Sequence, residues 1–145
     1  MTGDPAFEWI EVTIDCIDVE AVSRFWCQLL GVSRVEDPLP GWARAAATVP
    51  GGPVLNFQPV PDPKVGKSRI HLDLRTDDLP AAIRRVGALD GACTGEVHIY
   101  EEGTVAVMTD PEGTEFCLTG PRSVGSLPGS STSPAGTLGR SATSP

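Results

Sequence analysis

The stretch that decides the fold runs from Glu8 to Gly31 and reads EWIEVTIDCIDVEAVSRFWCQLLG. Its first half alternates, with apolar side chains at positions 10, 12, 14 and 16, which is typical of a strand with one buried face. Asp18 then stands where a helix N-cap is expected, and apolar residues follow at helical spacing as far as Leu30. Gly31 is a helix stop. The stretch therefore predicts a strand followed by a helix over residues 19–30.

The same pattern returns 60 residues later, in SRIHLDLRTDDLPAAIRRVGALDG from Ser68 to Gly91. Residues 69–75 alternate in the same way, and Asp78 takes the place of the first capping aspartate. Gly91 takes the place of the first stop glycine. We therefore predict a second strand and helix that repeat the first pair.

Strand-like sequence follows each predicted helix. In the first half it covers residues 32–35, 43–49 and 54–60, and in the second half residues 93–100, 105–109 and 114–119. The last strands of the two halves match with an offset of 59, which aligns residues 56–58 (NFQ) with residues 115–117 (EFC). The sequence thus predicts an α+β fold of two tandem βαβββ modules, a first module (residues 8–60) and a second module (residues 69–119).

One such module is a curled mixed sheet with a helix on one face, so its other face needs a partner. Two modules would enclose a central cleft between their open faces. By alternation, the polar residues of that cleft are Glu11, Thr13, Asp15, Asn56, Gln58, His71, Asp73, Arg75, Glu115 and Cys117. A cleft of this kind predicts binding of a small molecule.

Composition excludes several classes of function. The 145 residues carry a net charge of −8, and before residue 121 nine basic residues face 19 acidic ones, a balance of −10. A field of this sign repels phosphate backbones, so we expect no nucleic-acid partner. No apolar run is long enough for a membrane helix, and no basic residue precedes an apolar run at the N-terminus. We expect a cytoplasmic protein whose four cysteines are reduced.

The last 25 residues, 121–145, differ in composition from the rest. Eighteen of them are Ser, Gly, Pro or Thr, and none is aromatic. Such a segment buries too little apolar surface to offset its ordering entropy, which predicts a disordered tail. The folded domain is then expected over residues 7–120.

The paired modules, the strand–Asp–helix opening and the closing segment DPEGTEFC (110–117) resemble the vicinal oxygen chelate superfamily. This is the glyoxalase, bleomycin-resistance and extradiol-dioxygenase fold. The HLDL segment (71–74) and the EFC ending (115–117) resemble small glyoxalase-like proteins of actinobacteria. The resemblance covers about residues 7–120 and implies a fold more strongly than any one activity.

The resemblance implies a set of metal ligands. In metal-using members, one ligand lies seven residues before each capping aspartate and another lies in each closing strand. The corresponding residues here are Glu11, Gln58, His71 and Cys117. This set suits zinc best among divalent ions, and no other cofactor is implied. Two alternatives stay open: Cys117 as a small buried thiol, and His71 as a hydrogen-bond partner of Glu11 or Asp73.

A glyoxalase-like mechanism also needs a carboxylate beside the metal to move a proton, and Glu11 or Glu115 is the candidate for that role. The candidate ligand-lining residues are Trp42, Asn56, Asp73, Tyr100 and Met108. Trp42 can equally be ordinary packing.

Three functions follow from this reading. The first is a glyoxalase-like protein that binds a small organic molecule in the cleft, with or without lyase or isomerase chemistry. The second is a non-catalytic, drug-sequestering protein like the bleomycin-resistance proteins, for which the acidic groove would hold a cationic compound. The third is a non-catalytic partner domain. The resemblance also implies a homodimer.

Overall fold

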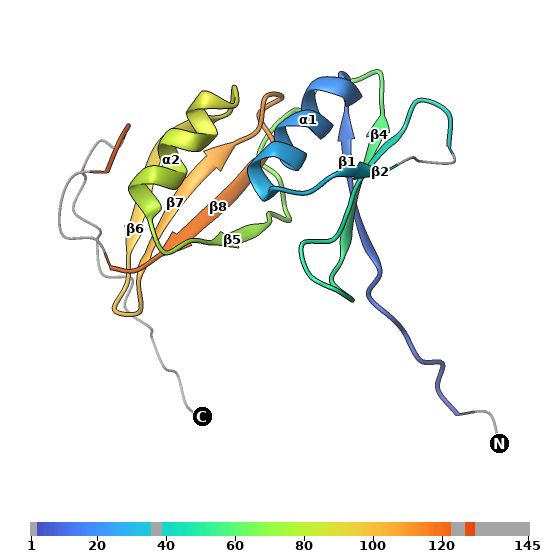
Figure 1. Ribbon diagram of the computed structural model, residues 1–145, viewed down its shortest axis with the longest axis horizontal. Coiled ribbons are helices and arrows are strands. Elements are labelled where there is room, and N and C mark those ends of the chain that lie inside the picture. Colours follow the sequence, from blue (N-terminus) through green and yellow to red (C-terminus); the bar gives the residue numbers. More distant parts are fainter. Residues whose placement is uncertain (1–2, 36–38, 123–126, 130–145) are drawn as a thin grey trace, which may run out of the picture.

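Two four-stranded sheets form the frame of the protein, a computed structural model of which describes residues 3–35, 39–122 and 127–129. The elements are β1 (Glu11–Cys16), α1 (Val19–Leu30), β2 (Arg34–Val35), β3 (Ala43–Ala45), β4 (Val54–Pro59), β5 (Asp73–Arg75), α2 (Leu79–Ala88), β6 (Ala92–Ile99), β7 (Thr104–Thr109) and β8 (Glu115–Gly120). The strand orders are β1-β4-β3-β2 and β5-β8-β7-β6. In each sheet the first strand runs parallel to the last and the other pairs are antiparallel. The predicted tandem βαβββ modules are confirmed (Figure 1).

Both helices begin at the predicted aspartates. The Asp18 carboxylate accepts a hydrogen bond from the N–H of Ala21, and the Asp78 carboxylate accepts one from the N–H of Ala81, each at 3.0 Å. These bonds satisfy one of the N–H groups that the first turn of a helix leaves unpaired. The helices therefore start where the sequence predicts, at positions 60 residues apart.

The two helices end differently, which corrects the predicted repeat. Gly31 ends α1 in the left-handed conformation at φ 65°, whereas α2 ends at Ala88, before Gly91. A Cβ at position 91 would lie 2.6 Å from Val86 Cγ1 and 2.8 Å from Phe25 Cε2. Gly91 is therefore required because its backbone packs against Val86, Phe25 and the Thr109 carbonyl, and not because it ends the helix.

An aromatic cluster joins the two modules through α1. The rings of Trp26 and Phe116 have centroids 4.9 Å apart, and Phe25 packs edge-on against both. The Trp26 indole N–H donates to the buried Asp110 carboxylate at 3.2 Å. Because α1 belongs to the first module and Phe116 and Asp110 to the second, this core fixes the modules to one another, with α1 lying between them (Figure 1).

The turn before β8 adds a polar link to the same junction. Both carboxylate oxygens of Glu112 accept backbone N–H groups at the start of α1, from Ile17 and Asp18, each at 2.7 Å. A carboxylate is favourable near a helix N-terminus, where the unpaired N–H groups lie.

The strand predicted over residues 69–75 is shorter in the structure. Only Asp73–Arg75 form β5, and Ile70, expected to be buried, is 81% exposed. The register pairs Asp73 with Cys117, and β8 begins only two residues earlier, so residues 69–70 extend past the end of their partner. Ile10 is exposed for the same reason at the start of β1, since β4 begins opposite residue 11.

The closing strands match with an offset of 61, which corrects the predicted 59. β1 pairs Thr13 with Asn56, and β5 pairs Asp73 with Cys117. The burial patterns agree, because residues 55–57 and 116–118 are the buried triplets of β4 and β8. Asn56, and not Gln58, is therefore the counterpart of Cys117.

Most of the predicted disordered tail lies outside the described residues. Residues 127–129 are described, and Leu127 is buried in the main hydrophobic cluster, with 6% of its surface exposed. A part of this segment thus contributes to the core. All four cysteines are free thiols. Neither helix in the described ranges is long and apolar enough to span a membrane.

Candidate functional site

A group of three possible metal ligands lies on the open face of the second sheet, the face that α2 does not cover. Asp73 on β5 pairs with Cys117 on β8, and His71 precedes Asp73 by two residues, so all three point to one side. One donor atom from each lies within 4.8 Å of the other two. The His71 Nδ1 lies 3.1 Å from an Asp73 carboxylate oxygen. We call this group the second-module cluster.

The charges around Cys117 are unfavourable for its thiolate without a cation. Burial raises the pKa of Cys117, and the carboxylates of Asp73 and Glu96 raise it further, while Lys67 acts weakly in the opposite direction. A bound divalent cation would reverse this balance, because it stabilises a thiolate directly.

The donor set fits zinc. An imidazole nitrogen, a carboxylate oxygen and a thiolate sulfur are its usual protein ligands, at bond lengths of about 2.0–2.3 Å. Tetrahedral geometry then places donor atoms about 3.5 Å apart. His71 and Asp73 are exposed and can rotate, so closing the cluster from within 4.8 Å requires side-chain movement alone. A three-residue set also leaves a position for an exogenous ligand.

The first module carries a different group at the corresponding place, which we call the first-module cluster. The Asn56 side-chain N–H donates to the Glu11 carboxylate, and the Arg44 Nε donates to the Asn56 side-chain oxygen Oδ1 at 2.7 Å. The Arg44 guanidinium also lies 3.6 Å from Glu11. This carboxylate thus already has a cationic partner within its own sheet.

The predicted ligand set is therefore divided between two sheets. His71 and Cys117 come together with Asp73, which was predicted to line the ligand site rather than to bind metal. Glu11 belongs to the first-module cluster. Gln58 is half-buried on β4, where it pairs with Asp15.

Glu115, a predicted proton acceptor, is held as an ion pair. Its carboxylate accepts hydrogen bonds from the Ser68 backbone N–H and from Lys64 Nζ, each at 3.1 Å. The hydrogen bond from Ser68 is the main cause that lowers the pKa of Glu115 to about 2; burial opposes it, and the bond from Lys64 makes a smaller contribution in the lowering direction. A carboxylate with so low a pKa is a weak base at neutral pH.

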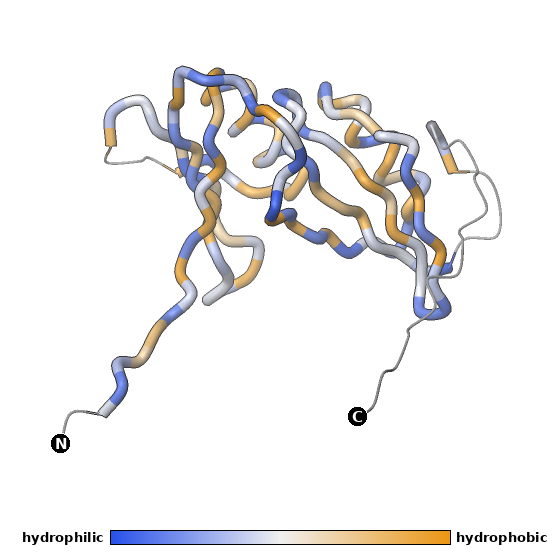
Figure 2. The backbone as a smooth tube through the Cα atoms, turned by 180° about the vertical axis from the view of Figure 1, so that it is seen from behind, coloured by the Kyte–Doolittle hydropathy of each residue, from blue (hydrophilic) through white to orange (hydrophobic). Residues whose placement is uncertain are grey.

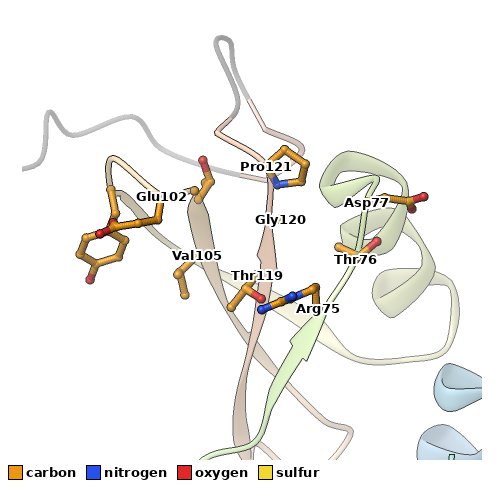
Figure 3. A pocket seen from close by; sticks show the side chains of 11 residues that line it. Arg75, Thr76, Asp77, Glu102, Val105, Thr119, Gly120 and Pro121 are labelled. Carbon is orange, nitrogen blue, oxygen red and sulfur yellow. The ribbon is translucent and has the colours of Figure 1, made fainter.

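Two cavities lie at opposite ends of β5. One of about 510 Å³ lies between the modules, and its lining includes Asp15 from the first module and His71 and Glu115 from the second. The other, of about 980 Å³, lies at the far end of the second sheet, and Arg75 and Tyr100 belong to its lining (Figure 3). The second-module cluster lies between them along the strand.

Three of the predicted lining residues, Tyr100, Met108 and Trp42, lie in different environments. Tyr100 lines the larger cavity. Met108 is fully buried in the core and belongs to the lining of neither cavity. Its neighbours on β7 alternate in burial, and Met108 points to the helix side of the sheet. Trp42 is half-buried just before β3.

A pair of polar residues on β6 was missed by the sequence reading. His98 Nε2 lies 2.7 Å from a Glu96 carboxylate oxygen, on the strand that contains a register shift between Cys93 and Val97. Gly95 within the shift has φ 86°. Bulges of this kind re-aim side chains, and alternation alone would not have revealed it.

Comparison with known proteins agrees with this architecture. Residues 11–119 match the glyoxalase-like domain family. The fold is similar to a glyoxalase/bleomycin resistance protein/dioxygenase family enzyme from Burkholderia phytofirmans, with 16% identity over 76% of this chain and 95% of that chain, and a TM-score of 0.63. It is similar to a protein described in the same terms from Nocardioides, with 15% identity over 91% and 93% and a TM-score of 0.63.

A third similar structure is the lactoylglutathione lyase from Agrobacterium tumefaciens, with 17% identity over 80% of this chain and 95% of that chain, and a TM-score of 0.57. A search of the curated proteins finds no match. Identities this low support a shared fold and do not carry an activity across. The family match covers three quarters of the chain, and the protein belongs to the glyoxalase-like domain family.

Proposed function

We propose that this protein binds a small organic molecule at a divalent metal centre held by His71, Asp73 and Cys117. The observation that carries the proposal is the convergence of three donors of different types within 4.8 Å on the open face of the second sheet. His71 also lines one of the two adjoining cavities. Zinc is the ion that this donor set favours.

The ion, when bound, would polarise an oxygen atom of the organic ligand as a Lewis acid. The protein contributes the orientation of the site. Asp73 contacts Nδ1 of the His71 ring, which holds these two donors next to each other before an ion binds. Burial of Cys117 keeps one side of the site dry, which strengthens electrostatic interactions there.

Lyase or isomerase chemistry would need a proton acceptor in addition. Glu115 is a weak base in its ion pair with Lys64, and Glu11 is engaged by Arg44 and Asn56 on the other sheet. We therefore propose metal-dependent binding as the function that the residues support best. An assay for proton exchange in Glu11→Gln and Glu115→Gln would test the two carboxylates in the catalytic role.

Cobalt titration tests the proposal, because a cobalt–thiolate bond produces a charge-transfer band that oxygen and nitrogen ligands do not. We expect metal-free protein, produced without an affinity tag, to develop this band at one equivalent of Co²⁺, and zinc to displace it. Cys117→Ser should abolish the band, whereas the matched control Cys93→Ser should retain it. A wild-type protein that shows no band and binds no zinc would refute the metal centre and leave a plain binding pocket.

We also propose that the protein is a homodimer in the cytoplasm. Residues 3–10 extend away from the body as an arm along which hydrophobic and hydrophilic residues alternate (Figures 1 and 2). On this arm Phe7 is 92% exposed and Trp9 76% exposed, an arrangement that favours burial against a second copy. The free Cys117 thiol required by the metal centre is compatible with a reducing compartment.

Light scattering coupled to size-exclusion chromatography tests the dimer. We expect the wild-type chain to elute with twice the monomer mass, and the double variant Phe7→Ser, Trp9→Ser to elute as a monomer. A matched double change at other exposed apolar positions, Val49→Ser with Val65→Ser, should leave the mass unchanged. A wild-type monomer at 100 micromolar would contradict the proposal.

A further inference from the structure

The lining of the larger cavity includes an exposed arginine, Arg75, for which the described part of the chain supplies no ion-pair partner. It has a volume of about 980 Å³ and lies at the end of the second sheet, where Arg75, Thr119 and Val105 form one row across β5, β8 and β7. Figure 3 shows the Arg75 side chain directed into the cavity toward Thr119. Among the residues that the structure describes, none forms a hydrogen bond or an ion pair with the Arg75 guanidinium.

A guanidinium in a concave site is suited to one type of ligand group. It is always charged at physiological pH, and its planar N–H groups match the two oxygens of a carboxylate. Val105 and Tyr100 add apolar surface to the lining of the same cavity. We infer that this cavity is a carboxylate-binding subsite, in which Arg75 binds the acid group of a small organic ligand.

The surrounding charges favour a single carboxylate over a polyanion such as a nucleotide. Asp77 and Glu102 also belong to the lining of the cavity, and Figure 3 shows the Asp77 side chain directed away from Arg75. Two carboxylates near one guanidinium oppose the accumulation of several negative charges, as does the overall acidity of the chain. One acid group can still bind Arg75 bidentately.

The subsite lies one row away from the proposed metal centre. Asp73 pairs with Cys117, and the next residues on the same face, Arg75 and Thr119, also pair with each other. Alternate residues of a strand lie about 6.6 Å apart. A ligand that spans both rows is an organic acid with a second oxygen donor about 6–7 Å from its carboxylate. This part of the inference rests on the proposed metal-dependent function, whereas the carboxylate subsite does not.

Titration with glutarate, followed by ¹H–¹⁵N NMR spectra, tests both parts. Glutarate carries two carboxylates at about the required spacing, and its diamide is a neutral control of the same shape. In metal-free protein we expect glutarate to shift the amide signals of Arg75 and Thr119, and the diamide to leave them unchanged. Arg75→Gln should weaken glutarate binding at least about tenfold, since it removes a charge-assisted bidentate contact. Arg84→Gln removes the same charge from exposed α2, on the covered side of the sheet, and should have no effect.

The zinc-loaded protein separates this inference from the proposed function. Zinc should tighten glutarate binding in the wild-type protein and fail to do so in Cys117→Ser. Equal glutarate affinity in wild type and Arg75→Gln, or equal binding of the diamide, would overturn the subsite. If glutarate binding depends on Arg75 but the protein binds no metal, the carboxylate subsite is supported and the metal-dependent function is refuted.

Discussion

The two modules share a frame and differ in what they place on its open face. In the first module, Arg44 and Asn56 bind the Glu11 carboxylate, so the charge of this carboxylate is balanced and its hydrogen bonds are formed within the protein. In the second, His71, Asp73 and Cys117 converge with no guanidinium among them. The comparison teaches that a duplicated fold can fill one site with its own ion pair and keep the other available for a ligand.

One position accounts for much of this difference. β3 pairs Arg44 with Asn56, and β7 pairs Val107 with Cys117, so Arg44 and Val107 occupy equivalent places beside equivalent residues. We therefore expect the cation in the first module and the apolar side chain in the second to decide whether a divalent cation can bind at each cluster. The predictions below test this comparison, from the largest expected effect to the smallest.

Val107→Arg should convert the second-module cluster into a copy of the first. The new guanidinium would lie beside Cys117 and Asp73, repel a divalent cation and pair with the carboxylate. We expect zinc affinity to fall about a hundredfold or more, measured by competition with a chromophoric chelator. Val105→Arg, on the same strand and face but two residues away from position 107, serves as the control and should lower zinc affinity by less than tenfold. Equal losses in the two variants would show that general charge, and not the position beside Cys117, controls binding.

The glycines after the two helices should respond differently to alanine. Gly91→Ala forces a methyl group against Val86 and Phe25, and should lower the free energy of unfolding by about 2 kcal/mol through overpacking. Gly31→Ala meets open space but requires a left-handed backbone, and should cost about 1 kcal/mol. Urea unfolding measures both. A larger loss for Gly31→Ala would mean that helix termination, and not close approach, is the main constraint.

Asp110, the buried carboxylate in the turn at the module junction, should make the free energy of unfolding depend on pH. Burial raises the pKa of Asp110, and hydrogen bonds from Thr114, Trp26 and Glu112 only partly oppose this. A raised pKa in the folded state means that the folded protein binds more protons than the unfolded chain. The contribution of protonated Asp110 to the free energy of unfolding is therefore fully present below about pH 4, and it is lost as the pH rises through the folded-state pKa.

Asp110→Asn removes that titration. Wild type should therefore lose stability relative to Asp110→Asn as the pH rises above about 4, measured as the difference in unfolding free energy at several pH values. The size of the change, and not the absolute stability of the variant, is the test, because asparagine also alters the hydrogen bonds to the turn. A difference that grows in favour of wild type with rising pH would contradict the assignment.

Much of the fold could be predicted because its signals are local. Alternation, the capping aspartates and the helical stripe each depend on a few neighbouring residues, and they placed both helix starts correctly. The register between strands depends on contacts far apart in sequence. Offsets of 59 and 61 keep every side chain on the same face, so alternation could not distinguish Gln58 from Asn56 as the counterpart of Cys117.

The candidate site could be predicted only in part, because it too depends on contacts between residues far apart in the sequence. The sequence placed His71, Asp73 and Cys117 on one open face, which the structure bears out, but it could not show that Glu11 lies in a separate cluster with Arg44. That separation follows from how the two sheets are joined by the aromatic core around Trp26. No pattern within either module encodes it.

The central claim is that the metal ligands all come from the second module, and a paired zinc titration tests it most directly. Calorimetry on Asp73→Asn and Glu11→Gln compares two charge-matched changes, one in each cluster. We predict one zinc ion per chain in wild type and in Glu11→Gln, and a loss of at least about a hundredfold in affinity in Asp73→Asn. Retention of zinc by Asp73→Asn with loss in Glu11→Gln would contradict the account and return the site to a cleft shared between the modules.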